Sequence, residues 1–211
     1  PRTAPVPPPD PLELQFDGSA APLDAIDKPV TRFVELRPAL EGQWTWTTER
    51  TLVFTPKASW PIGQKYTVAL DPQLVARPNT LLLTRELTFS TQPFTAALVD
   101  SEFYQDPVDP QLKQVVTTVR FNYPADVKAL ESKVALSSAP LSNPSQKAQH
   151  RVSITWDDLH FEAALRSEAL PLPLEDHRAE FQVQAGLRPE APGGATERPL
   201  SATVTIPGKG N

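Results

Sequence analysis

The sequence predicts an all-β protein made of two tandem antiparallel β-sandwich domains. Three observations lead to this fold class. Apolar residues recur at every second position in many short runs, as in strands that bury one face. Proline accounts for 25 of the 211 residues, which is typical of short strands with rigid turns and blunted edges. No segment keeps the 3.6-residue period of an amphipathic helix.

The same pattern divides the chain into four parts. Residues 1–11 (PRTAPVPPPDP) are rich in proline and predict a semi-rigid extended spacer. Residues 12–93 predict the first sandwich and residues 94–207 the second, and residues 208–211 are predicted to be a tail. Each sandwich is long enough to bury a core of its own.

The first domain carries about seven short strand patterns, the number found in one sandwich. The pattern starts with alternating apolar residues over 12–16 and continues over 30–36 to a stop at Pro38. The clearest feature follows, a hairpin over 42–56 in which two tryptophans lie on one face and two apolar residues lie opposite them: Trp44, Trp46, Leu52 and Phe54.

A turn with proline and glycine leads into the next strand, over 66–70. The run Trp60-Pro61-Ile62-Gly63-Gln64-Lys65-Tyr66 resembles the corner of immunoglobulin-like sandwiches, where a tyrosine packs inward. Residues 87–91 complete the first domain before Pro93. In the second domain the alternating positions fall in seven further runs, within 94–98, 115–123, 134–136, 152–156, 161–165, 179–183 and 202–206.

The run FVELRPALEGQWTWTTERTLVFTPKASWPIGQKYTVAL, residues 33–70, resembles the first macroglobulin-like domain of bacterial alpha-2-macroglobulins. The residues that carry the resemblance form three motifs: Pro38, then Gly42, Trp44, Trp46, Leu52, Phe54 and Pro56, then Pro61, Gly63, Tyr66 and Val68. The segments 103–107 (FYQDP) and 115–124 (VVTTVRFNYP) are similar to the domain that follows in that family. The resemblance implies two tandem Ig-like, macroglobulin-like β-sandwich domains.

That family implies a large protein that traps host or foreign proteases, in the Gram-negative periplasm and often tethered through an N-terminal lipid. Proteases cut a bait segment and the body rearranges around them. This chain would then supply non-catalytic leading scaffold domains. Its partners would be neighbouring domains, proteases met through the full-length protein, and other periplasmic proteins. Many members hold a cysteine thioester, which this chain cannot contain because it has no cysteine.

The candidate contact residues are Trp60, Phe103 and Tyr104. Trp60 lies in a proline-flanked turn and is the best candidate for an exposed ring that meets a neighbouring domain. No catalytic, cofactor-binding or metal-ligating residue is expected. The net charge of −5, with no run of five Lys or Arg, argues against a nucleic-acid binder. The sequence contains no apolar stretch of about 20 residues, so no membrane span is predicted.

Three groups of ionisable residues could form a metal or catalytic site, or could simply be exposed on the surface. The three histidines lack the spacing of a zinc site, the acidic segment 100–109 lacks a calcium-loop glycine, and the carboxylates at 157, 158 and 162 have no evident pocket. We therefore predict surface positions for the histidines, which are His150, His160 and His177. We predict a solvated loop for the acidic segment, with Asp100, Glu102, Asp106 and Asp109. We predict solvent exposure for the carboxylates of Asp157, Asp158 and Glu162. The alternative function is an Ig-like binding module of a surface adhesin or polysaccharide-binding protein, for which exposed tryptophans would stack on sugars.

Overall fold

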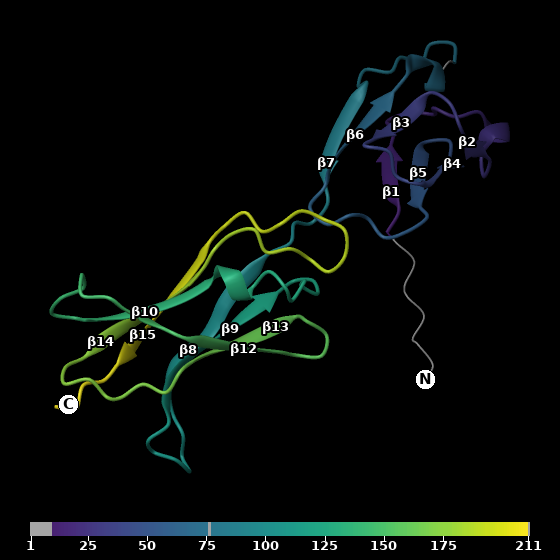
Figure 1. Ribbon diagram of the computed structural model, residues 1–211. Coiled ribbons are helices and arrows are strands. Elements are labelled where there is room, and N and C mark those ends of the chain that lie inside the picture. Colours follow the sequence, from purple (N-terminus) through teal and green to yellow (C-terminus); the bar gives the residue numbers. More distant parts are fainter. Residues whose placement is uncertain (1–9, 76, 211) are drawn as a thin grey trace, which may run out of the picture. The chain divides into compact units, whose positions relative to one another are not determined.

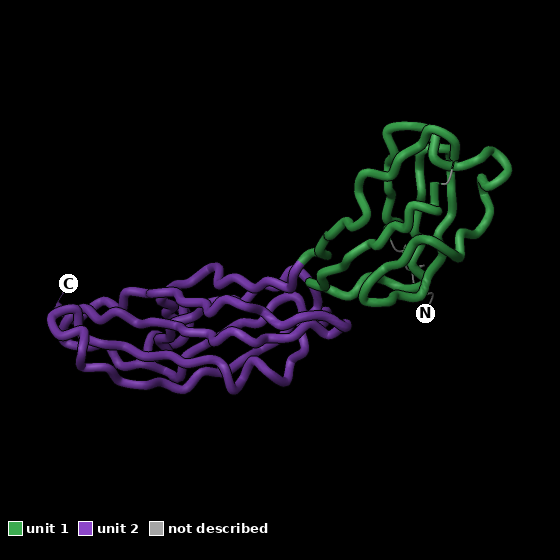
Figure 2. The backbone as a smooth tube through the Cα atoms, turned by 90° about the horizontal axis from the view of Figure 1, so that it is seen from above, with its two compact units in different colours: residues 1–92 green, residues 93–211 purple. Residues whose placement is uncertain are grey.

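The computed structural model describes residues 10–75 and 77–210. Nine of the eleven residues of the predicted spacer, and Asn211 of the predicted tail, lie outside the described residues. The chain folds into two compact units, Pro1–Gln92 and Pro93–Asn211, here called unit 1 and unit 2 (Figure 2). The four-part division drawn from the sequence stays a prediction.

All regular structure in the described residues is strand or short 3-10 helix, and every strand pair is antiparallel (Figure 1). The predicted all-β class is therefore confirmed. Within that part of the chain, no helix is long and apolar enough to cross a bilayer.

Over residues 10–75 and 77–92, unit 1 contains seven strands in two sheets, of order β1-β5-β4-β2 and β3-β6-β7. Two 3-10 helices, η1 and η2, lie in its loops. The bounds are β1 Leu12–Gln15, η1 Leu23–Ala25, β2 Pro29–Val30, β3 Val34–Arg37, β4 Gly42–Thr48, β5 Thr51–Pro56, β6 Lys65–Leu70, η2 Pro72–Val75 and β7 Glu86–Ser90.

Up to residue 210, the last that the structure describes, unit 2 contains eight strands in two four-stranded sheets, of order β11-β10-β14-β15 and β12-β13-β9-β8. One 3-10 helix, η3, precedes β10. The bounds are β8 Ala96–Gln105, β9 Lys113–Phe121, η3 Glu131–Lys133, β10 Val134–Pro140, β11 Ala148–His150, β12 Val152–Trp156, β13 Glu162–Ser167, β14 His177–Val183 and β15 Leu200–Ile206.

The tryptophan hairpin has the register that its alternation predicts. Trp44 of β4 lies opposite Phe54 of β5, and Trp46 lies opposite Leu52. All four side chains are buried, and the rings of Trp44 and Phe54 are 5.1 Å apart between centroids. Such aromatic pairs stabilise a fold by about 0.5–1.5 kcal/mol beyond their area burial, so this hairpin is the centre of the unit 1 core.

The alternation from Val30 to Leu36 does not form one strand, and that prediction is wrong. β2 ends at Val30 and pairs with β4, whereas β3 begins at Val34 and pairs with β6 of the other sheet. Between them Phe33 adopts a φ of 74°, in the left-handed region that non-glycine residues rarely adopt. The chain therefore crosses from one sheet to the other inside a run that keeps its period of two.

The second core is built between the two sheets of unit 2. Its largest fully buried side chain is Phe181 of β14, accompanied by Val119 of β9 and Leu165 of β13. The rings of Phe94 and Phe121 stack 5.4 Å apart at an interplanar angle of 4°. Gly208 of the predicted tail is buried, and its N–H donates to Asp176 Oδ1 at 2.7 Å, so ordered structure continues past β15.

Candidate functional site

Trp60, the first candidate contact residue, lies in the loop between β5 and β6 and is half-buried. Its indole ring packs against the rings of Phe54, Tyr66 and Phe89, with centroid separations of 5.8, 5.2 and 5.6 Å. The indole Nε1–H donates to the carbonyl oxygen of Asp10 at 2.7 Å. Trp60 therefore joins residues of both sheets and fixes the chain just before β1.

This placement corrects the expectation of an openly exposed ring at Trp60. An indole that packs on three aromatic neighbours of its own unit contributes mainly to the core. The inward position of Tyr66 agrees with the predicted corner, and burial raises the pKa of its phenol. A contact of Trp60 with another domain stays a prediction.

Phe103 and Tyr104 are adjacent in β8, in unit 2, so the structure does not bring them together with Trp60 in one unit. They lie opposite Val115 and Gln114 of β9 and are half-buried. Because adjacent strand residues point to opposite faces, the two rings cannot form one continuous surface. Their role as domain contacts also stays a prediction.

Tyr104 has polar partners that hold its ring in place. Its hydroxyl donates to Asp106 Oδ2 at 3.3 Å, and the guanidinium of Arg166 lies 5.9 Å from the ring centroid. Asp106 Oδ1 accepts the N–H groups of Val108 and Asp109 at 2.8 and 2.9 Å. These backbone hydrogen bonds, that of Asp109 first, lower the pKa of Asp106, because they stabilise the ionised carboxylate.

The sequence predicted that the acidic segment 100–109 is one solvated loop, and that prediction is wrong. Residues up to Gln105 belong to β8, which has a register irregularity between Val99 and Glu102. Only the part around Asp106 forms a turn, and its carboxylate is used to hold that turn. Over residues 10–75 and 77–210 there is no group of three or more His, Cys, Asp or Glu placed to hold a metal ion.

The histidines have separate partners. His150 Nε2 lies 2.6 Å from Ser138 Oγ, His160 Nδ1 lies 3.5 Å from Glu190 Oε2, and His177 Nδ1 lies 2.9 Å from the carbonyl oxygen of Glu175. Each of these contacts is local to unit 2.

The carboxylates at 157 and 162 have structural partners as well. Asp157 Oδ1 accepts the Glu162 N–H at 2.9 Å, across the turn between β12 and β13. Glu162 Oε1 pairs with Arg120 Nε of β9 at 2.9 Å, near the surface. These contacts position a turn and a strand pair, and the two carboxylates have different partners.

The tryptophans do not form an exposed stacking surface. Trp44 and Trp46 are buried, and Trp60 and Trp156 are half-buried. Trp156 stacks on Phe121 at 5.7 Å with an interplanar angle of 17°. These placements do not favour the alternative of a sugar-binding module.

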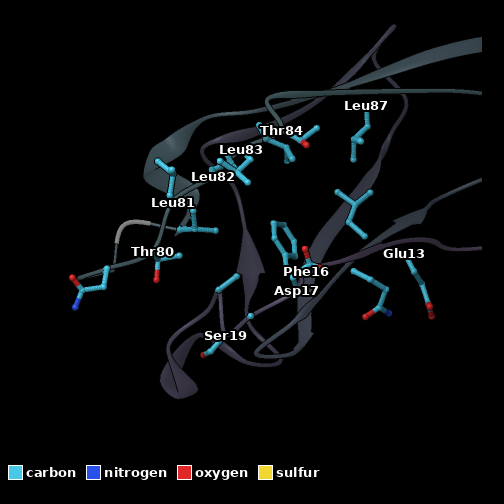
Figure 3. Close-up of a pocket in the computed structure, with 17 residues that line it drawn as sticks. Glu13, Phe16, Asp17, Ser19, Thr80, Leu81, Leu82, Leu83, Thr84 and Leu87 are labelled. Carbon is cyan, nitrogen blue, oxygen red and sulfur yellow. The ribbon is translucent and has the colours of Figure 1, made fainter.

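A hollow in unit 1 was not anticipated. It lies beside β1 and is lined on one side by residues 13–20 and on the other by residues 79–84 and Leu87 (Figure 3). A signal did exist in the sequence, because the run Leu81-Leu82-Leu83 has no alternation that would bury it in a strand.

Comparison with known proteins places these features in a family. The chain is 33% identical over 197 residues to the alpha-2-macroglobulin homolog of Yersinia pestis, a match that covers 93% of this chain and 10% of that protein. The chain belongs to the bacterial alpha-2-macroglobulin family. It is also 26% identical to an alpha-2-macroglobulin of Pasteurella multocida, over 94% of this chain and 11% of that protein. A third relative, from Rickettsia conorii, is 24% identical over 77% of this chain.

The resemblance drawn from the sequence is thus confirmed, although no family model matches the chain. The chain spans about a tenth of the length of the alpha-2-macroglobulins that it matches. The motif residues Gly42, Trp44 and Phe54 belong to the central hairpin of unit 1, so the family motif encodes a packing arrangement.

Proposed function

We infer that this chain forms non-catalytic scaffold domains of a bacterial alpha-2-macroglobulin that traps host or foreign proteases. The observation that carries the proposal is the similarity along 93% of the chain to the Yersinia pestis alpha-2-macroglobulin homolog. The contacts of Asp106, Asp157 and Glu162 support it, because these carboxylates hold turns and a strand pair. The work of these domains would be to space and contact the neighbouring domains of the parent protein.

The architecture suits a protein that meets proteases. Strands of two to ten residues are joined by proline-rich connections. Rigid, proline-bearing turns present few extended segments that a protease can bind and cut, and proline at strand edges discourages edge-to-edge association.

The isolated 211-residue chain is expected to inhibit no protease, because a trap must enclose its target and these domains are a small part of such a body. The measurement is cleavage of a fluorescent protein substrate by trypsin, with the chain in molar excess. The full-length parent protein is the matched positive control, and it should slow that cleavage. Stoichiometric inhibition by the chain alone would contradict the proposal.

We also propose that the parent protein resides in the Gram-negative periplasm, tethered to the inner membrane through its N-terminus, where proteases and other periplasmic proteins are its partners. Osmotic-shock fractionation of cells that express the full-length protein tests this location. Recovery of the protein with cytoplasmic markers would contradict it.

A further inference from the structure

The hollow beside β1 has the form of a groove that runs along an open sheet edge. It has a volume of about 590 Å³, within the range of about 300–1,000 Å³ that is usual for ligand sites. Figure 3 shows leucines 81–83 along one wall and Phe16 and Asp17 on the other. The parts that line it all belong to unit 1.

One wall of the groove is a strand edge with unused main-chain hydrogen-bonding groups. Among the strands of the described residues, β1 is the terminal strand of its sheet and pairs only with β5. The Phe16 N–H donates to the Arg50 carbonyl oxygen at 2.8 Å, and in antiparallel pairs such bonded positions alternate. The main-chain groups of Glu13 and Gln15 therefore face away from β5, and among the described residues none of them has a hydrogen-bond partner.

The other wall is apolar and exposed. Residues 79–85 form no strand, and Leu81 and Leu83 project from this segment with 79% and 85% of their surface accessible. Leu82, between them, packs against the core, and Leu87 of β7 adds a further apolar side chain that is 38% exposed. Apolar side chains gathered beside a free strand edge mark an interaction site rather than an ordinary surface.

The charge of the groove limits what can fill it. The ionised side chains that line it are Glu13 and Asp17. Two cations touch its margin, because Arg50 Nη1 donates to the Asp17 carbonyl oxygen at 3.2 Å and Arg77 Nη1 donates to Ser19 Oγ at 2.6 Å. Both guanidinium groups lie at the end of the groove near residues 17–19, so Glu13 is the carboxylate best placed to attract a cation. A second copy of this chain is a poor match, because its net charge is −5. The leading residues 1–9 are a poor match too, since five of them are proline and proline has no N–H to donate to a strand ladder.

We propose that the groove binds an extended segment of a partner protein, in which apolar side chains alternate with lysine or arginine. The segment adds a strand to β1, and its main chain pairs with the outward N–H and C=O groups of Glu13 and Gln15. Its apolar side chains contact Leu83 and Leu87, and its cations lie near Glu13 and Asp17. This is strand addition, in which the main chain supplies affinity and alternate side chains supply specificity. The inference does not depend on protease trapping.

A screen of blocked nonapeptides tests the proposal. The peptides carry Val, Leu, Ile or Phe at odd positions and Lys, Arg, Thr or Glu at even positions, and their binding to the full chain is measured by fluorescence polarisation. We expect binders enriched in Lys and Arg at the even positions. Addition of the tightest binder should slow amide exchange at Glu13 and Gln15. Absence of binders, enrichment in Glu, or protection elsewhere in the chain would overturn the proposal.

Two variants test the two walls separately. Gln15→Pro removes an outward N–H and keeps the main-chain bonds of β1 to β5, losing only the surface bond that Thr51 Oγ1 donates to Gln15 Oε1 at 3.1 Å. Binding should weaken about two- to tenfold, the effect of losing one hydrogen bond. Leu83→Lys removes apolar surface and adds a like charge, and it should weaken binding at least as much. Leu174→Lys in unit 2, at a position that is 87% exposed, is the matched control and should bind normally. Unchanged affinity in both groove variants would refute the site.

Amide exchange of the free chain shows whether the groove is instead occupied by the chain's own leading segment or by a second copy. We expect the Glu13 and Gln15 amides to exchange fast when no peptide is present. Protection of both amides in dilute chain would assign the groove to the chain's own leading segment. Protection that grows with chain concentration would assign it to a second copy. Either result would overturn the proposal.

Discussion

Replacement of Phe181 by alanine is expected to destabilise unit 2 by about 3–5 kcal/mol, the usual cost of deleting a buried phenylalanine ring. Phe181 has no accessible surface and lies in β14, between Leu136 of β10 and Ala202 of β15. Neighbours held in two ladders cannot collapse far into the space left by the ring. Since a domain is stable by only about 5–15 kcal/mol, much of the stability of unit 2 should be lost.

Hydrogen exchange of the whole chain, resolved by mass spectrometry into peptides, measures this loss in β9, β13 and β14. Phe181→Leu is the matched variant, because it keeps most of the apolar volume and should cost less than about 1.5 kcal/mol. Unit 1 has a core of its own, so its amides provide an internal reference. A loss below about 1 kcal/mol for Phe181→Ala, well under the usual range, would show that the ring is not the centre of this core.

The parts of the fold that could be predicted from the sequence are those fixed by local alternation. In the hairpin of β4 and β5, a one-residue slip would turn Trp44 and Trp46 to the solvent, so the pattern alone sets the register. β9 is similar, because Val115, Val119 and Phe121 recur on one face and are buried. In both cases the information lies within a single hairpin or strand.

The features that sequence reasoning missed depend on contacts between distant residues. Nothing local distinguishes Val30 from Val34, yet the chain changes sheets between them at Phe33. Trp60 looks like an exposed turn residue until β6 and β7 bring Tyr66 and Phe89 against its ring. The groove has the same origin, since the order of strands in a sheet decides that β1 is an edge.

Replacement of Gly42 by alanine is expected to destabilise unit 1 by about 1–3 kcal/mol, the usual cost of overpacking a core. A Cβ atom at this position would lie 2.5 Å from Cζ of Phe54 and 2.5 Å from the carbonyl oxygen of Thr55. The ring is held by Trp44 and Trp60, and the carbonyl belongs to β5, so neither can move away without disturbing the core. Glycine begins the Gly-x-Trp-x-Trp motif because the ring of Phe54 lies where a side chain would start.

Urea unfolding followed by tryptophan fluorescence measures this effect, since Trp44, Trp46 and Trp60 all lie in unit 1. Gly18→Ala is the matched control, because a Cβ there has nothing within 4 Å and the change should stay within about 0.5 kcal/mol. The double variant Gly42→Ala with Phe54→Leu separates the two clashes. If the ring alone opposes the Cβ, shortening it should cancel the cost of the alanine. Because the Thr55 carbonyl is equally close, we expect part of the penalty to persist, and full cancellation would contradict this account of the motif.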